Sequence, residues 1–304
     1  RGPLCRKGLM PEMVGGSESS GVELGGRNCS LVMDRPYIVG ILNVTPDSFS
    51  DGGRYLDLQR AVAHGLKMVA EGADLIDIGG ESTRPGASQI SEQEELDRVI
   101  PVVEKLAREV DLPLSIDTSK SVVAREAVSA GADFVNDVSG LAFDTRMPGV
   151  VADTGAGLIV MHTRGRPEVM QQDTHYSDLF AEVVASLTNS IAVAESAGVA
   201  RDRIAIDPGI GFGKDVAGNL ELLRRTADLV TLGRPVMLGT SRKSFIGRVL
   251  GKDDPAERLA GTLATVALGY AGGARLFRVH DVAAARDAAM MAHAVCKGAA
   301  WGGL

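Results

Sequence analysis

The chain has 304 residues, enough for two ordinary domains or for one large α/β barrel. Its 32 Lys and Arg against 39 Asp and Glu give a formal charge of −7, which argues against a broad surface for nucleic acid or anionic membranes. No apolar run reaches the roughly 18 residues of a membrane span, and no secretory leader is recognisable. We therefore expect a cytoplasmic protein whose partners are small molecules, with no nucleic acid and no membrane among them.

The two ends of the chain differ in composition from its middle. Residues 1–30 are rich in Gly and Ser and show no periodic apolar pattern, so we expect a flexible N-terminal extension there. Residues 298–304 are similarly loose, and we expect a flexible C-terminal tail. Residues 31–297 then form the folded domain. The three cysteines, Cys5, Cys29 and Cys296, lie far apart without metal-binding spacing, which fits a reducing compartment.

Short apolar runs alternate with helical patterns along the middle of the chain. The predicted strands are Ile38–Val44, Leu75–Ile78, Leu114–Ile116, Phe134–Val135, Leu158–Met161, Ile204–Ile206, Val236–Leu238 and Leu276–Val279. The predicted helices are Asp57–Glu71, Ser91–Val110, Ser119–Ala130, Tyr176–Ala197, Asn219–Ala227, Pro255–Tyr270 and Val282–Val295. This series of β/α units predicts an α/β protein with a (β/α)₈ TIM barrel, whose active site lies at the C-terminal ends of the strands. A doubly wound open sheet is the alternative, but no GxGxxG comes after the first strand.

The stretch IAIDPGIGFGK (204–214) shows most clearly how these strands end. Its apolar strand stops at Asp207, and Pro208 with Gly209 prevents the ladder from continuing. Taken alone, Asp207 is as consistent with a turn or a helix cap as with a site residue. Because all eight predicted strands end in polar residues, however, we interpret their shared rim as a functional site.

The polar residues at this rim fall into two chemical groups. Asp117, Asn136 and Asp207 form an acceptor-rich cluster suited to a flat ligand with several N–H donors, such as an amino-pyrimidinone, and Lys243 lies beside them. Arg278 and His280 are two residues apart and share one face of a strand. With Asn43 on the neighbouring first strand, they are suited to an anionic group and its metal ion. For His280 or Lys243 alone, an ordinary structural or surface role would be the better interpretation.

Eight segments, in this order, closely resemble the dihydropteroate synthase family. They are GILNVTPDSFSDGG (40–53), DIGGESTRPGA (77–87), SIDTSK (115–120), NDVSG (136–140), MHTRG (161–165), DPGIGFGK (207–214), GTSRKSFIG (239–247) and RVHD (278–281). The resemblance covers residues 37–296. It implies a transferase that condenses 7,8-dihydropterin-6-ylmethyl diphosphate with 4-aminobenzoate, giving 7,8-dihydropteroate and pyrophosphate in folate biosynthesis.

The resemblance also implies roles for individual residues. The pterin ring would be held by Asp117, Asn136, Asp207 and Lys243, and the diphosphate by Asn43, Thr83, Arg278 and His280, with Mg²⁺ as cofactor against Asn43. Two loops, 45–54 and 82–86, would close over the site, and Asp47 and Arg84 would pair on closure. The aminobenzoate pocket would be bordered by Phe49, Pro85, Phe212 and Ser244. The pocket has one aromatic residue in its glycine-rich turn, so we expect sulfonamides, which resemble 4-aminobenzoate, to bind.

Two other functions are consistent with parts of the same pattern. A pterin-binding methyltransferase would share the barrel and the acceptor cluster but would have no use for a diphosphate side at Arg278 and His280. A non-catalytic pterin-binding paralogue would be expected to lose a loop residue among Asp47, Thr83 and Arg84, and all three are present. We also expect a homodimer, because long helices with apolar faces, such as Pro255–Tyr270, often form interfaces, although the same pattern fits packing against the core of one chain equally well.

Overall fold

A closed parallel barrel forms the centre of the molecule in the computed structural model, which describes residues 22–45, 53–83 and 86–300. Its strands are β3 (Tyr37–Asn43), β4 (Leu75–Gly79), β5 (Leu114–Asp117), β6 (Phe134–Asp137), β7 (Gly157–Met161), β8 (Ile204–Asp207), β9 (Met237–Leu238) and β10 (Leu276–Val279). They pair in the order β8-β7-β6-β5-β4-β3-β10-β9. A parallel bridge between Ile206 and Val236 joins the two edges, so the predicted TIM barrel is confirmed.

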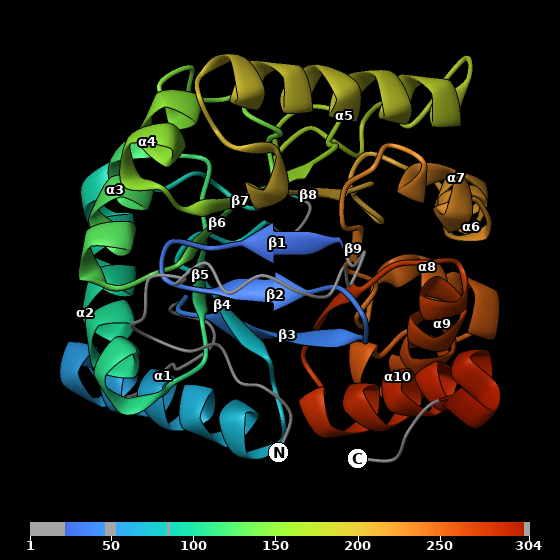
Figure 1. Ribbon diagram of the computed structural model, residues 1–304, viewed down its shortest axis with the longest axis horizontal. Coiled ribbons are helices and arrows are strands. Elements are labelled where there is room, and N and C mark those ends of the chain that lie inside the picture. Colours follow the sequence, from blue (N-terminus) through green and yellow to red (C-terminus); the bar gives the residue numbers. More distant parts are fainter. Residues whose placement is uncertain (1–21, 46–52, 84–85, 301–304) are drawn as a thin grey trace, which may run out of the picture.

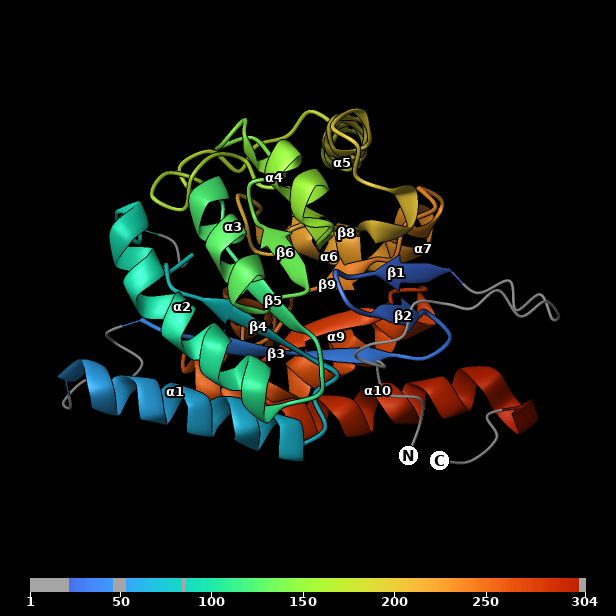
Figure 2. The same cartoon turned by 60° about the vertical axis from the view of Figure 1, so that its left-hand side comes forward.

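The helices surround the barrel on its outside (Figure 1; Figure 2). They are α1 (Gly53–Ala70), α2 (Glu92–Glu109), α3 (Ser121–Ala130), α4 (Met147–Thr154), α5 (Leu179–Ser196), α6 (Val216–Arg224), α7 (Thr226–Val230), α8 (Ser244–Leu250), α9 (Leu259–Ala271) and α10 (Val282–Lys297). Short 3₁₀ segments lie at η2 (Arg201–Arg203), η3 (Pro255–Arg258) and η4 (Gly298–Ala300). Within the described residues, no helix combines the length and apolar character needed to cross a membrane.

Each of the seven predicted helical segments corresponds to a helical region of the structure. Two of them differ in detail from the prediction, and two further helices are not predicted. The segment predicted over 219–227 is divided at Arg225 into α6 and α7, and the one predicted from Pro255 begins as the 3₁₀ segment η3. The sequence patterns do not predict α4, which is only 8 residues long and contains Pro148 and Gly149, or α8, whose 7 residues begin at the predicted site residue Ser244.

Helix α2 illustrates how the outer layer is built. Ser91 caps its N-terminus, because the side-chain oxygen accepts a hydrogen bond from the Glu94 N–H at 3.1 Å. Val99, Val103 and Leu106 recur at helical spacing and are fully buried against the barrel. Outward-facing strand residues such as Ile76 and Ile116 belong to the same core cluster. This layer between strands and helices holds each strand end in a fixed place.

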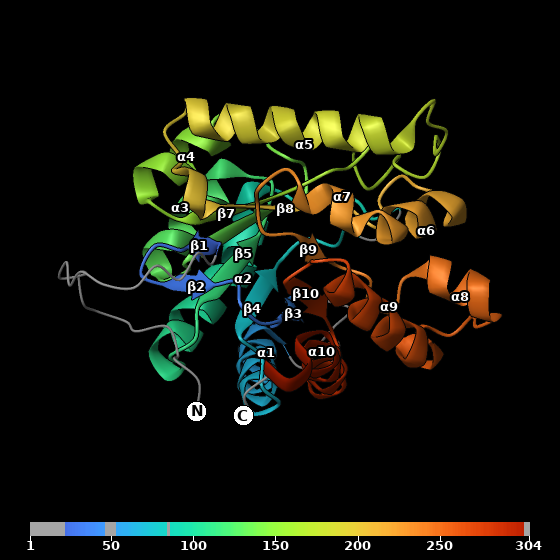
Figure 3. The same ribbon diagram turned by 45° about the vertical axis from the view of Figure 1, so that its right-hand side comes forward.

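The N-terminal end of the barrel is closed by a two-stranded hairpin, β1 (Glu23–Gly25) and β2 (Ser30–Val32). In Figure 1 this hairpin lies across the centre of the ring of helices, and Figure 3 shows it from the side. Leu24 is completely buried and packs with Phe134 and Leu75 inside the barrel. Gly157 makes room for this contact, because a Cβ there would lie 2.3 Å from Phe134 and 2.6 Å from the Gly25 carbonyl.

The prediction of a flexible extension over 1–30 is therefore wrong for its last part. Residues 22–30 belong to the folded domain, because Leu24 packs in the core inside the barrel. Residues 1–21 lie outside the described part of the chain. The apolar signal is hard to see because each strand has only three residues and glycines surround them. At the other end, the predicted tail begins with the turn η4 (Gly298–Ala300), and residues 301–304 are not described.

Candidate active site

A layer of polar side chains occupies the inside of the barrel near the C-terminal ends of its strands. Alternate residues of a strand point to the same face, so side chains two apart share the interior. In four strands an apolar inward residue is followed two positions later by a polar one. These pairs are Leu75 and Asp77 in β4, Phe134 and Asn136 in β6, Ala205 and Asp207 in β8, and Leu276 and Arg278 in β10.

Arg278 is the centre of this layer. Its Nε donates to Asp77 Oδ2 at 2.6 Å and its Nη2 donates to Asp117 Oδ2 at 2.7 Å. Asp77 Oδ2 also accepts from the Asn136 amide at 2.9 Å, so one carboxylate joins the cation to the neighbouring amide. Only 17% of the Arg278 side chain is exposed, and the two carboxylates are more deeply buried. The planar guanidinium thus holds four strands in a fixed polar arrangement.

Burial dominates the electrostatics of this layer. It raises the pKa of Asp117 to about 7; the Arg278 charge opposes this shift, while Asp77 adds to it. Burial works to lower the pKa of Arg278, but Asp77 and Asp117 together raise it above its ordinary value. Arg278 therefore stays a cation, and Asp117 is a carboxyl group whose charge depends on pH near neutrality.

Several acceptor atoms in the layer are still available. Asp77 Oδ1 and Asn136 Oδ1 are buried and find no hydrogen-bond partner among the residues that the structure describes. Burying such groups without a partner is costly, so they mark a place where donors from a ligand would be stabilising. Asp207 lies in the same layer, and burial raises its pKa while Lys243 opposes the rise. The predicted acceptor cluster of Asp117, Asn136 and Asp207 is thus brought together.

The turn after β8 is held tightly against this layer. Asp207 Oδ1 accepts the Gly209 N–H at 2.7 Å. Lys214, which is buried, donates to the carbonyls of Gly209 and Phe212, each at 2.8 Å. Gly209 has φ +70°, and a Cβ there would lie 1.8 Å from the His162 carbonyl oxygen, so only glycine fits. The glycine-rich segment therefore gives a rigid turn, and Lys214 is a structural residue within it.

Lys243 reaches over this turn from the loop after β9. Its ammonium group donates to the Ile210 carbonyl and lies 4.3 Å from the centre of the Phe212 ring. Burial lowers the pKa of Lys243 to about 7, although Asp207 opposes the shift. Ser244 is the first residue of α8 and is exposed. Lys243 therefore lies beside both Phe212 and Asp207, with Ser244 at the outer edge.

The predicted anion-binding side, formed by Asn43, Arg278 and His280, differs in part from the arrangement that the sequence predicts. His280 Nδ1 lies 2.9 Å from the Ser241 hydroxyl, which also accepts the His280 backbone N–H at 3.1 Å. Asn43 ends β3, and its register neighbour is Gly79, which pairs in turn with Asp117. The sequence pattern separates Arg278 from the acceptor cluster, whereas its guanidinium is bonded within that cluster. Arg278 therefore links the two sides.

Arg242 fixes the loop between Ser241 and Lys243. It adopts the left-handed conformation with φ +57°, which is uncommon for a residue with a side chain. Its Nε donates to Asp281 Oδ2 at 2.9 Å and its Nη2 to Asp281 Oδ1 at 2.5 Å, while its N–H donates to Thr262 Oγ1 at 3.0 Å. These bonds stabilise the local conformation that directs Lys243 toward Phe212.

Thr83 lies at the opposite edge of the site. It lines a small pocket together with Glu81, Glu95, Asp117 and Thr118, between the ends of β4 and β5. Four predicted site residues, Asp47, Phe49, Arg84 and Pro85, lie outside the described residues. Their predicted roles in the two loops and the aminobenzoate pocket remain predictions.

Asp77 is the main site residue that sequence reasoning misses. It lies within the strand sequence LIDIG, where it is easily taken for part of an apolar run. A carboxylate at a position that should face the inside of a barrel is the available signal, because such a charge is almost never fully buried without a partner. For Lys214, in the glycine-rich turn, nothing in the spacing indicates that it bonds the turn's own carbonyls.

Among the described residues, no three His, Cys, Asp or Glu side chains are grouped so as to hold a metal ion by themselves. Asn43, at the rim, offers one neutral amide oxygen. This fits an ion such as Mg²⁺, which retains several waters and is commonly held through substrate phosphates as well as the protein. The residues present are therefore compatible with an Mg²⁺ ion that enters together with a diphosphate.

Comparisons with known proteins agree with this geometry. A family model described as a pterin binding enzyme matches residues 39–280. The chain is 48% identical over 261 residues to a dihydropteroate synthase of Synechocystis sp., covering 86% of this chain and 90% of that protein. The fold is similar to the Xanthomonas albilineans dihydropteroate synthase solved with 4-aminobenzoic acid, with a TM-score of 0.86, 47% identity and coverage of 91% and 98%.

A second solved structure extends the comparison to an inhibitor complex. The Yersinia pestis dihydropteroate synthase in a sulfonamide drug complex superposes with a TM-score of 0.85 at 42% identity, covering 91% of this chain and 100% of that one. The matched region includes every strand end that contributes to the polar layer. The chain therefore belongs to the pterin-binding enzyme family and, within it, to the dihydropteroate synthases.

Proposed function

We propose that the polar layer of the barrel condenses 7,8-dihydropterin-6-ylmethyl diphosphate with 4-aminobenzoate, as a dihydropteroate synthase does. The observation that carries this proposal is the buried group in which Arg278 joins Asp77 and Asp117, with Asn136 Oδ1 left as an available acceptor. The relatives named above are dihydropteroate synthases at 42–48% identity, and those with solved structures share the fold. The chain is accordingly a transferase of folate biosynthesis.

The pterin ring would bind against the acceptor side of this layer. Its ring N–H and amino groups would donate to Asn136 Oδ1, Asp207 and Asp117, and Lys243 would donate to a ring carbonyl or nitrogen. A lowered pKa suits Lys243 for this task, because a less strongly protonated amine is cheaper to bury beside a neutral ring. Asp117 would then lie near the methylene carbon that reacts.

The diphosphate would lie toward Asn43, Thr83 and His280. The Nε N–H and one Nη2 N–H of Arg278 are used by carboxylates, so the N–H groups left on Nη1 and Nη2 are what it offers to the anion. Mg²⁺ would be held by the Asn43 amide oxygen together with the diphosphate, and when bound it would offset the charge of the leaving group. The arrangement needs no protein nucleophile, because positioned charges stabilise the departing diphosphate and Asp117 stabilises positive charge on the methylene.

The 4-aminobenzoate would approach beside Phe212 and Ser244, with Phe49 and Pro85 as further predicted neighbours. Phe212 is held between the Lys214 and Lys243 contacts, so its ring gives a fixed wall. Sulfonamides resemble 4-aminobenzoate and would occupy the same place. If the pocket forms only when the diphosphate side is filled, their affinity should be much higher with pterin, Mg²⁺ and pyrophosphate present than without them. Calorimetry in both conditions tests this, and equal affinities would contradict it.

We further propose that the protein is a cytoplasmic homodimer. Leu268 of α9 and Met291 and Val295 of α10 are 64–70% exposed, although they are apolar, and α9 packs directly on α10. A second copy covering these helices would remove that surface from water. Light scattering after size-exclusion chromatography measures the state directly, and a monomer at micromolar concentration would contradict the dimer.

The test of function is pyrophosphate release from the pterin diphosphate. We expect release that requires both 4-aminobenzoate and Mg²⁺, with 7,8-dihydropteroate formed in equal amount. Release without 4-aminobenzoate would indicate a different acceptor, and full turnover in excess chelator would contradict the proposed Mg²⁺. A pterin-binding protein that releases no pyrophosphate under any condition would be a non-catalytic paralogue.

A further inference from the structure

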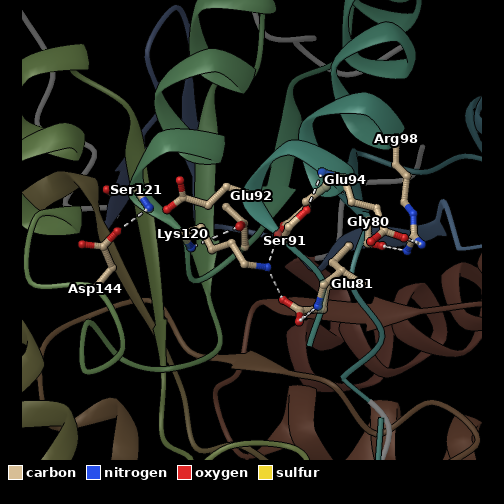
Figure 4. Close-up of polar contacts among 12 residues, drawn as sticks. Gly80, Glu81, Ser91, Glu92, Glu94, Arg98, Lys120, Ser121 and Asp144 are labelled. Atoms are coloured by element: carbon tan, nitrogen blue, oxygen red, sulfur yellow. Dashed lines mark hydrogen bonds and ion pairs between the residues drawn. The ribbon is translucent and has the colours of Figure 1, made fainter. Parts of the chain in front are cut away.

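A partly buried lysine bridges two glutamates directly behind the rim of the site. Lys120 Nζ lies 2.6 Å from Glu81 Oε2 and 2.5 Å from Glu95 Oε2. Figure 4 shows Lys120 pointing from the turn after β5 toward Glu81, which lies just after β4. Glu95 comes from the first turn of α2 and is completely buried. We call Glu81, Lys120 and Glu95 the stem cluster.

The stem cluster holds both ends of the segment 82–89. Glu81 uses its second oxygen, Oε1, to accept the Ile90 N–H at 3.1 Å, so one carboxylate binds the start and the end of this segment. Gly80, which comes directly before Glu81, is also fixed, because Arg98 Nη1 donates to its carbonyl at 2.8 Å (Figure 4). Farther along, Gly86 N–H donates to the Pro167 carbonyl at 3.1 Å. The segment is therefore anchored at its stem by charge.

The stem cluster also forms one wall of the pocket beside Asp117. Glu81, Thr83 and Glu95 line this pocket together with Asp117 and Thr118. Lys120 lies three residues after Asp117, in the turn that follows β5, and its backbone N–H donates to Thr118 Oγ1 at 3.2 Å. One ion-paired cluster thus connects the end of β5, which carries Asp117, to the segment that carries Thr83. A change in the cluster would move these two residues relative to each other.

Lys120 is the cation that offsets both carboxylates of the stem cluster. Two carboxylates share one ammonium group, and Glu95 Oε1 is buried without a hydrogen-bond partner in the described part of the chain. Burial raises the pKa of Glu95, and Lys120 opposes that rise. If Lys120 were removed, the two carboxylates would face each other without a counter-charge and would separate or take up a proton. An ordinary surface ion pair has no such consequence.

We propose that Lys120 and Glu81 are positioning residues, which set the distance between Thr83 and Asp117 and thereby the fit of the diphosphate-bearing substrate. The inference rests on the proposed function only for the identity of that substrate. Positioning of this kind has large kinetic effects, since a misplacement of about 1 Å can cost on the order of 10²-fold in rate. Neither residue is required to touch the substrate.

The test compares Lys120→Met with Lys120→Arg and with Arg146→Met. Arg146 is a matched control, because it also bridges two carboxylates, at 2.9 Å from Asp144 and 3.6 Å from Glu92, but is 62% exposed. We expect Lys120→Met to lower kcat/KM for the pterin diphosphate by about 10²-fold, mainly through KM. Lys120→Arg should restore most of this loss, and Arg146→Met should match the wild type. The concentration of folded enzyme is measured by circular dichroism before each assay.

A stabilising role alone would give a different result. Lys120→Met would then unfold at lower temperature but keep the wild-type KM per folded molecule, which would overturn the proposal. If Lys120→Met does not fold, Glu81→Gln takes its place, because it keeps the shape and weakens the bonds to Lys120 and Ile90. An unchanged KM in Glu81→Gln would equally overturn the proposal. Absence of turnover in the wild type would instead contradict the proposed function.

Discussion

The two ends of the barrel are built from the same strands but have opposite chemistry. At the N-terminal end, inward residues such as Leu75 and Phe134 are apolar and pack around Leu24 of the hairpin. Two residues farther along the same strands, Asp77 and Asn136 are polar and bond to each other at 2.9 Å. One end thus stabilises the fold by burying apolar area, while the other buries charge, which costs free energy unless it is paired. The comparison indicates that the polar end is retained for function.

The largest effect should come from removing the cation at the polar end. In Arg278→Met, Asp77 and Asp117 would remain buried without their guanidinium partner, because both ion pairs, at 2.6 and 2.7 Å, are lost. We expect the free energy of unfolding to fall by about 3–5 kcal/mol and turnover to be lost. Urea denaturation monitored by circular dichroism measures the first quantity. Unchanged stability would show that the pairs contribute little, and the contrast between the two ends would then weaken.

A somewhat smaller effect, confined to stability, is expected at the apolar end. Leu24→Ala would leave a cavity between the hairpin and Phe134, where Leu24 is now fully buried. We expect a loss of about 2–5 kcal/mol in the free energy of unfolding, depending on how well the site collapses. Since the change is remote from the polar layer, kcat and KM of the folded enzyme should not change. A clear rise in KM would mean that the two ends are mechanically coupled.

The same contrast explains how much the sequence could reveal. All eight barrel strands are predictable, because each is a short apolar run with a turn signal after it. Asp207 is placed correctly at a strand end because Pro208 and Gly209 stop the strand. The hairpin is missed because its two strands of 3 residues carry too few apolar positions to show a period. Their fit depends on distant residues such as Phe134.

Contacts between strands distant in sequence are harder to predict than the strands themselves. Asp77 and Arg278 are 201 residues apart, and nothing local indicates that the guanidinium turns toward the carboxylates and not toward the rim. The pairing of β10, the last strand, with β3, the first strand of the barrel, and of β3 with β4 brings them together. For that reason the sequence alone assigns Arg278 to the anion side only.

A third prediction concerns the dependence of stability on pH. Burial raises the pKa of Asp117 from 3.8 to about 7, so the folded carboxyl keeps a proton that the unfolded chain releases. The resulting contribution to stability is complete below about pH 4 and is lost as the pH rises through about 7. Asp117→Asn does not titrate, so its free energy of unfolding should decline less than that of the wild type over this range. Denaturation curves at several pH values provide the test, and parallel declines would contradict the assignment to Asp117.

The central claim is that the polar end of the barrel binds the pterin and the apolar end does not contribute. The most direct measurement is calorimetry of 7,8-dihydropteroate with the wild type, Leu24→Ala and Asp207→Asn. Hydrogen bonds to a charged group contribute about 1.5–3 kcal/mol, so Asp207→Asn should bind about 10- to 150-fold more weakly. Leu24→Ala should bind like the wild type while folded. Equal affinity in all three proteins would contradict the account, as would a loss of binding in Leu24→Ala alone.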